Sequence, residues 1–187
     1  MHDHPLLSSF VARVQAALPV AERLEALLAE LTETDGAPLA QYLAAQHLAV
    51  DLGGLDVLLA MPGSLSLARP LAALLELPLV ELSGQEGAWK LAYEGLEERP
   101  RALLVGLELT SGLPELEVTL LAQGLGSEIQ ALVCLLERST AQGRHRLLQL
   151  GVQTHAALQI AFIPASAMAT GGWILERRGP KVKRTTE

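Results

Sequence analysis

Apolar residues recur at helical spacing along the first fifty positions of the chain. They form two stripes of the kind that lines the buried face of an amphipathic helix. The first stripe contains Leu6, Leu7, Phe10, Val11 and Val14, and the second contains Leu24, Leu27, Leu28 and Leu31. Pro19 separates the stripes, and a turn at Thr34, Asp35 and Gly36 precedes a third helix over residues 38–48, opening on Pro38. The pattern predicts a cap of two or three helices.

After Gly53 and Gly54, short apolar runs alternate with helical stretches. Strands are predicted over residues 56–60, 78–82, 102–107, 128–137 and 152–160, and helices over residues 65–76, 113–125 and 142–150. Runs such as VLLA, ALLV and ALVCLL are apolar without alternation, which is typical of strands covered by helices on both faces. We therefore expect an α/β fold, with a doubly wound, mostly parallel sheet flanked by helices and an N-terminal helical cap. Such sheets bind ligands in the loops that follow the carboxyl ends of their strands.

The composition is that of one domain. Of the 187 residues 50% are hydrophobic but only 3% aromatic, so the core is built from Leu, Ala and Val. Residues 1–50 are predicted to be the helical cap of this domain, residues 51–176 its α/β core and residues 177–187 a basic tail. No apolar run reaches the roughly 18 residues of a membrane span, and the N-terminus does not resemble a signal peptide. We expect a cytoplasmic protein without membrane contact.

The chain offers little for metal or nucleophilic chemistry. Its one cysteine, Cys134, lies in an apolar strand and is predicted to be a small buried hydrophobe. Neither a CxxC motif nor a cluster of Cys and His is present to hold zinc, so no metal site is expected. No nucleophile can be matched with a base and an orienting acid, and no catalytic residue is assigned.

The net charge of -7 argues against DNA as a partner, because duplex binding depends on Lys and Arg that displace counterions from phosphates. The tail is the exception, with five Lys or Arg against one Glu. This composition fits a solvated terminus, and it also fits a contact with RNA, an acidic partner or a neighbouring subunit.

Two stretches resemble a known family. The segment GSEIQALVCLLERSTAQGRHRLLQLGV resembles the strand, loop and helix that follow the catalytic loop in xanthine and adenine phosphoribosyltransferases, the purine salvage branch of the type I phosphoribosyltransferases. Upstream, DVLLAMPGSLSLARPLAALLELPLVEL is similar to the same family's first strand, pyrophosphate loop, helix and second strand. The likeness covers about residues 37–160 and rests on the order and spacing of elements. It implies a protein that handles phosphoribosyl pyrophosphate, a purine nucleotide or phosphate, and that forms a homodimer.

The donor-binding motif of this family is degenerate here. The family places two adjacent acids after four apolar residues, and those positions hold Gly106 and Leu107. Glu108 comes one residue late, which in a strand directs it to another side unless the backbone bulges. The phosphate cradle survives in part as Thr110, Ser111 and Gly112, which could bind a phosphate or simply cap the following helix. Pro114 contributes no N–H to an anion, and Glu115 and Glu117 would repel one.

The other functional loops of the family are reduced as well. The pyrophosphate loop reads Pro62, Gly63 and Ser64, without the charged side chains usual there. Residues 83–100, where the family carries its lid, keep Trp89 and Tyr93, which could stack on a purine or pack a shortened lid onto the body. Residues 142–146, with two arginines, are either a second anion contact or a solvated helix start.

Three functions remain open at this stage. The first is a phosphoribosyltransferase-like protein that has lost catalysis and binds a nucleotide, a phosphate ligand or a protein partner. Losing two carboxylates and two cations removes on the order of 6 kcal/mol of transition-state binding, about ten-thousand-fold in rate. The second is an active purine phosphoribosyltransferase that uses magnesium, with acids supplied by Glu108 and Glu115. The third is a purely structural interaction module. No cofactor is expected except magnesium in the active version.

Overall fold

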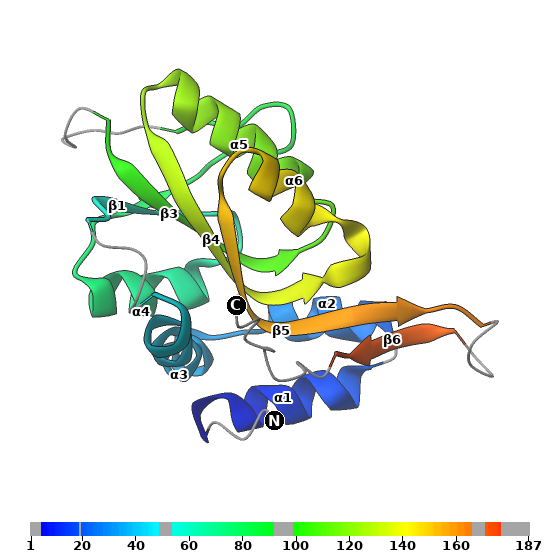
Figure 1. Cartoon of the computed structure of the whole chain (residues 1–187). Coiled ribbons are helices and arrows are strands. Elements are labelled where there is room, and N and C mark those ends of the chain that lie inside the picture. The colour runs from blue at the N-terminus through cyan, green and yellow to red at the C-terminus, as the bar shows by residue number, and fades with distance from the viewer. Residues whose placement is uncertain (1–4, 19, 49–53, 92–98, 166–170, 177–187) are drawn as a thin grey trace, which may run out of the picture.

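The computed structural model describes residues 5–18, 20–48, 54–91, 99–165 and 171–176. Its centre is a six-stranded sheet with the strand order β2-β1-β3-β4-β5-β6 (Figure 1). The strands are β1 (Val57–Ala60), β2 (Leu79–Glu81), β3 (Arg101–Leu109), β4 (Glu128–Arg138), β5 (Gln153–Ile163) and β6 (Gly172–Leu175). Neighbouring strands are parallel from β2 to β5, and β6 is antiparallel to β5. The expected mostly parallel sheet is confirmed.

Helices cover both faces of this sheet. The helices are α1 (Pro5–Ala17), α2 (Ala21–Ala29), α3 (Glu33–Leu43), α4 (Leu65–Leu75), α5 (Leu113–Gly124) and α6 (Gly143–Gln149), with a π-helical turn at Ala44–Leu48 and a 3-10 turn at Ser139–Ala141. Figure 1 shows α5 and α6 on one side of the sheet and α1, α3 and α4 on the other. The doubly wound arrangement and the N-terminal helices agree with the sequence analysis.

Alternate residues of the central strands pack into two separate cores. Leu58 and Leu103 join a cluster with buried residues of α1 to α4, whereas Leu59 and Leu104 join a second cluster with α5 and α6. All four side chains have no exposed surface. Burial on both faces explains why these strands read as continuous apolar runs.

The start of the third helix differs from the prediction. Thr32 and Asp35 form a capping box: the Asp35 N–H donates to Thr32 Oγ1 at 3.3 Å, and the Thr32 N–H donates to Asp35 Oδ2 at 3.1 Å. The bond from the Thr32 N–H is the largest cause that lowers the pKa of Asp35, followed by the hydrogen bond that the Thr32 hydroxyl donates to the same carboxylate at 2.8 Å. The residues predicted as a turn are therefore the first turn of α3, and Pro38 lies inside the helix, because the cap satisfies the N-terminal N–H groups earlier in the chain.

The sequence analysis missed β6. This strand pairs antiparallel with β5, placing Phe162 opposite Trp173, and their rings meet edge to face with centroids 5.5 Å apart. The pairing also extends β5 to Ile163, three residues past the predicted end. None of the helices in the described part of the chain has the length and apolarity to cross a membrane.

Candidate functional site

The carboxyl ends of β1 and β3 form the switch point of the sheet, because the strands that follow lie on opposite sides of this pair. Open α/β sheets bind ligands at such a point. Two loops leave from here, residues 61–64 after β1 and residues 110–112 after β3. They contain the predicted pyrophosphate and phosphate positions.

The 61–64 loop is held by its own serine. The Ser64 hydroxyl is fully buried and lies 2.7 Å from the carbonyl oxygen of Met61 and 3.0 Å from that of Val105. Gly63 has a φ of 80°, which allows the tight turn. Pro62 and Gly63 are exposed. Ser64 thus joins the end of β1 to β3, and the loop presents no charged side chain to a ligand.

The degenerate donor motif lies within β3. Gly106 is buried opposite Cys134 of β4, and Leu107 packs against the core on the α1 to α4 side. The Glu108 carboxylate accepts hydrogen bonds from Arg138 Nε at 2.6 Å and Nη2 at 3.2 Å. Glu108, the acid that follows the two motif positions, is therefore neutralised by an arginine on the neighbouring strand.

The 110–112 loop turns sharply into α5. Gly112 is the N-cap with a φ of 74°, and the Leu113 N–H donates to Ser111 Oγ at 3.3 Å. Gly143, at the start of α6, packs directly on this loop: a Cβ on Gly112 would lie 2.8 Å from the Gly143 Cα, and a Cβ on Gly143 would lie 2.4 Å from the Thr110 oxygen. Two glycines are thus needed for the two helix starts to meet.

This contact brings together two segments that sequence analysis treated separately. Arg146 of α6 donates a hydrogen bond from Nη1 to the carbonyl oxygen of Ser111. Its guanidinium therefore lies beside the N-terminus of α5, where backbone dipoles favour an anion. In the described part of the chain no carboxylate lies within ion-pair distance of Arg146, in contrast to Arg138 and Arg144.

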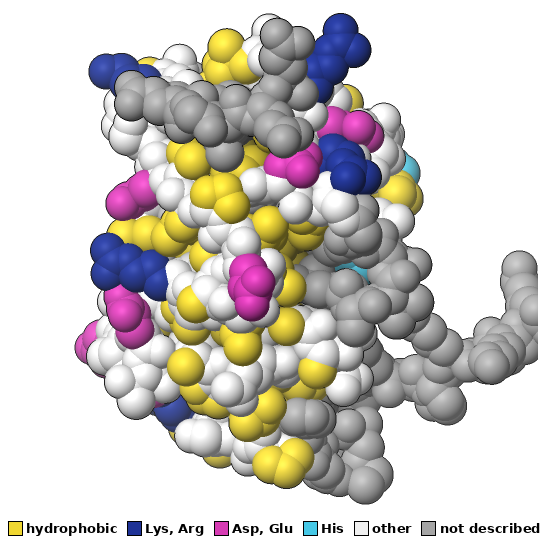
Figure 2. Space-filling view, turned by 90° about the vertical axis from the view of Figure 1, so that its left-hand side faces the viewer, with side chains coloured by type: hydrophobic (Ala, Val, Ile, Leu, Met, Phe, Trp, Pro, Cys, Tyr) yellow, Lys and Arg dark blue, Asp and Glu magenta, His cyan; other side chains and the backbone are white. Residues whose placement is uncertain are grey.

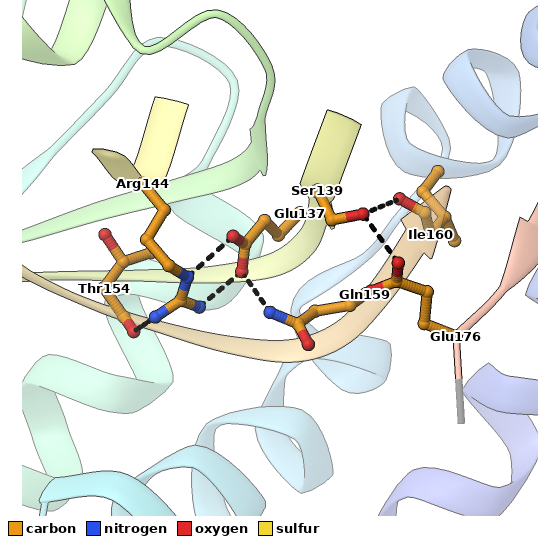
Figure 3. Close-up of polar contacts among 7 residues, drawn as sticks. All are labelled: Glu137, Ser139, Arg144, Thr154, Gln159, Ile160 and Glu176. Atoms are coloured by element: carbon orange, nitrogen blue, oxygen red, sulfur yellow. Dashed lines mark hydrogen bonds and ion pairs between the residues drawn. The ribbon is translucent and has the colours of Figure 1, made fainter. Parts of the chain in front are cut away.

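A partly buried network of hydrogen bonds fixes the turn between β4 and α6 (Figure 3). Glu137, whose side chain is 4% exposed, accepts hydrogen bonds from Arg144 Nε at 2.7 Å and from Gln159 Nε2 at 2.8 Å. Arg144 also bonds the carbonyl oxygen of Thr154 at 2.6 Å, and its bond to Glu137 raises its pKa. Ser139 adds a 2.8 Å hydrogen bond to Glu176. This network positions the start of α6, and with it Arg146.

Two glutamates in the first half of α5 have different surroundings. Glu115 is 6% exposed, and its Oε2 atom has no hydrogen-bond partner among the described residues. Burial raises the pKa of Glu115 to about 7, and the charge of Glu108 adds to the effect. Glu117 Oε2 instead accepts hydrogen bonds from the Gly87 N–H at 2.8 Å and from Trp89 Nε1 at 2.9 Å.

The bonds to Glu117 tie residues 83–91 to α5. The Ser83 and Lys90 backbones pair across this segment, and Trp89 packs against the core beneath α5. The Trp89 indole thus packs against the second core cluster and is held there by its hydrogen bond to Glu117. Tyr93, the other predicted stacking residue, lies outside the described residues. Cys134 is fully buried, and burial raises the pKa of its thiol.

Comparisons with known proteins identify the fold. No protein-family model and no curated protein sequence matches the chain. Solved structures of adenine phosphoribosyltransferases do match. The enzyme of Thermoanaerobacter pseudethanolicus is 17% identical with a TM-score of 0.53, over 68% of this chain and 84% of that one. The Saccharomyces cerevisiae enzyme, solved with adenine and an imino-altritol bisphosphate, is 13% identical with a TM-score of 0.56, over 67% and 79%. That of Rhodothermus marinus is 21% identical with a TM-score of 0.53, over 65% and 79%.

The chain therefore has the type I phosphoribosyltransferase fold. The structures that match include adenine phosphoribosyltransferases, a type I phosphoribosyltransferase family, as the resemblance in sequence predicted.

Proposed function

We propose that this chain is a non-catalytic protein of the phosphoribosyltransferase fold that binds a phosphate-bearing ligand. The ligand phosphate would lie between the 110–112 loop, at the N-terminus of α5, and the guanidinium of Arg146. The observation that carries the proposal is the placement of Arg146, which bonds the Ser111 carbonyl and has no carboxylate partner in the described part of the chain.

Loss of catalysis is supported by the lack of an available carboxylate at the site. Positions 106 and 107 supply no carboxylate for the ribose hydroxyls, and Glu108 is held by Arg138. Glu115, the second acid of the active alternative, is buried beneath α5. These residues do not fit magnesium bound with the sugar donor, since Mg²⁺ prefers free carboxylate oxygens. Phosphoribosyl transfer depends on charge stabilisation that this site does not supply.

Phosphate binding is supported by what the site retains. Thr110 and Ser111 are half-buried, and their hydroxyls are part of the same loop as the N-cap of α5. A guanidinium beside a helix N-terminus adds a full positive charge to the end of the helix dipole that favours an anion. The adenine phosphoribosyltransferase of Trypanosoma brucei was solved with AMP, pyrophosphate and ribose-5-phosphate, and it shares this fold with 12% identity and a TM-score of 0.51. A purine nucleotide is thus the first ligand to test.

Thermal unfolding with AMP, phosphoribosyl pyrophosphate or phosphate, each with and without magnesium, tests binding. A concentration-dependent rise in Tm with at least one of these is expected. In parallel, adenine, guanine, hypoxanthine and xanthine are incubated with phosphoribosyl pyrophosphate at high protein concentration, and pyrophosphate release is measured. Pyrophosphate release above background would establish the active alternative. If no compound shifts the Tm, phosphate binding is rejected and the purely structural interaction module remains as the function.

The predicted homodimer is a separate expectation. Figure 2 views the molecule from the left of Figure 1, the side of β1 and α4, and shows a band of hydrophobic side chains over this face. On α4, Leu74 is 46% exposed. Sedimentation or light scattering at micromolar concentration measures the mass directly, and a mass of one chain would reject the dimer.

A further inference from the structure

Glu115 is the third residue of α5, immediately after the proposed phosphate site. With a rise of about 1.5 Å per residue, the first residue of the helix is roughly 3 Å away along the helix axis, about half a turn. The side chain does not face water: it is 6% exposed, and Oε2 has no hydrogen-bond partner in the described part of the molecule. An ionised carboxylate in this position is costly, because burial removes its water and outweighs the hydrogen bond from the Glu115 backbone N–H, which favours the ionised form.

The charged groups on the surrounding elements do not offset this cost. Glu108 on β3 adds a negative charge that acts on Glu115. On β4, Glu137 is paired with Arg144 of α6, and the Cys134 thiol is neutral.

Arg146 of α6 bonds the Ser111 carbonyl, and Glu117 on α5 itself bonds Gly87 and Trp89. None of these cations forms an ion pair with Glu115 within the described ranges.

We infer that Glu115 couples anion binding at the 110–112 loop and Arg146 to proton uptake, so that the ligand binds tightly when this carboxyl is neutral and weakly when it is ionised. The inference rests on the proposed function and deepens it. A ligand phosphate and an ionised Glu115 would repel each other across a poorly solvated turn. By linkage, the bound anion favours the protonated carboxyl to the same degree that the proton favours the anion. Burial places this titration near pH 7.

Sulfate is the probe, because it stays a dianion across the relevant range, whereas phosphate esters titrate at about pH 6. Isothermal titration at pH 6 and pH 8 should show sulfate binding up to about tenfold tighter at pH 6, the ratio of the neutral fractions of Glu115 at the two pH values. In Glu115→Gln the affinity should be equal at both pH values and close to that of the native chain at pH 6. The same titration near pH 7, in two buffers of different ionisation enthalpy, measures the protons taken up by the native chain without relying on any variant.

Two variants test other sources of pH dependence. Glu117→Gln removes the same charge two residues further along α5, and His145→Gln removes the exposed imidazole next to Arg146. Both should keep the pH dependence. Three results would overturn this inference and leave the proposed function standing. The first is a sulfate affinity that is equal at pH 6 and pH 8. The others are a pH dependence of sulfate affinity that survives in Glu115→Gln, or one that disappears in His145→Gln. Absence of sulfate binding at both pH values would overturn the proposed function, and the inference with it.

Discussion

The carboxylate of Glu108 is held in a two-pronged hydrogen bond by Arg138, the last residue of the neighbouring strand. Both side chains are about 15% exposed. Arg138 also reaches Glu25 of α2 at 3.4 Å and lies 4.9 Å from the centroid of the Trp173 ring. One guanidinium therefore connects β3, β4, β6 and helix α2.

This arrangement predicts unequal roles for the two acids that contact Arg138. Arg138→Met leaves Glu108 without a partner in a mostly buried position and should lower the free energy of unfolding by about 2 to 4 kcal/mol. Glu25→Gln removes a contact whose carboxylate is 62% exposed, and should change it by less than about 1 kcal/mol. Urea denaturation of both variants measures the difference. Equal, small losses would show that the Glu108 pair contributes nothing to stability.

A second prediction compares two glycines. Gly36 lies in α3 where a Cβ would come within 1.8 Å of the Ser66 carbonyl oxygen of α4, whereas at Gly106 the nearest atom, on Leu132, is 3.9 Å away. Gly36→Ala must push two helix backbones apart and should cost about 3 kcal/mol or more, while Gly106→Ala should cost less than about 1 kcal/mol. Denaturation midpoints and soluble yield are the readouts. A Gly36→Ala protein as stable as the native one would refute the close approach of α3 and α4.

The strand pattern was readable from sequence because burial is uniform along the central strands, and a run such as VLLA has no polar face to obscure it. The start of α3 was misplaced because Asp35 and Gly36 are common in turns and were interpreted as one. The spacing of three residues between Thr32 and Asp35, which is typical of a capping box at a helix start, was overlooked. Strand β6 was missed because its four residues depend on pairing with β5 rather than on a pattern of their own.

The candidate site was predictable only in part. The absence of acids at positions 106 and 107 could be read from the sequence, because the whole motif lies in one continuous strand. The meeting of Arg146 with Ser111 does not, because the two residues are 35 positions apart and belong to different helix starts. The sequence contains only a weak indication that Glu137 pairs with Arg144: an acid stands at the end of an apolar strand, seven residues before an arginine.

Arg146 gives the third prediction. Arg146→Gln should abolish the Tm increase caused by AMP or phosphate, because it removes the one guanidinium of the proposed site. The variant should lose only about 1 kcal/mol of stability, the usual contribution of a hydrogen bond such as that to the Ser111 carbonyl. Arg69→Gln, which removes an exposed arginine paired with Glu33, is the matched control and should keep the ligand response. An unchanged Tm increase in Arg146→Gln would place any bound phosphate elsewhere.

The last prediction concerns stability and pH in the absence of ligand. The pKa of Glu115 rises from 4.5, its ordinary value, to about 7 in the folded chain, so the folded state holds a proton that the unfolded state has released between these two values. Stability must then fall as pH increases from about 4.5 to 7 and level off above, by up to about 3 kcal/mol in total from this group. In Glu115→Gln this loss is absent. The free energy of unfolding of the variant should therefore equal or exceed that of the native chain at pH 8 and differ little from it at pH 5. Urea denaturation at both pH values provides the comparison, with Glu117→Gln as the control that should retain the native slope. A Glu115→Gln protein that is less stable than the native chain at pH 8 would mean that the ionised carboxylate is well solvated, contrary to its burial beneath α5.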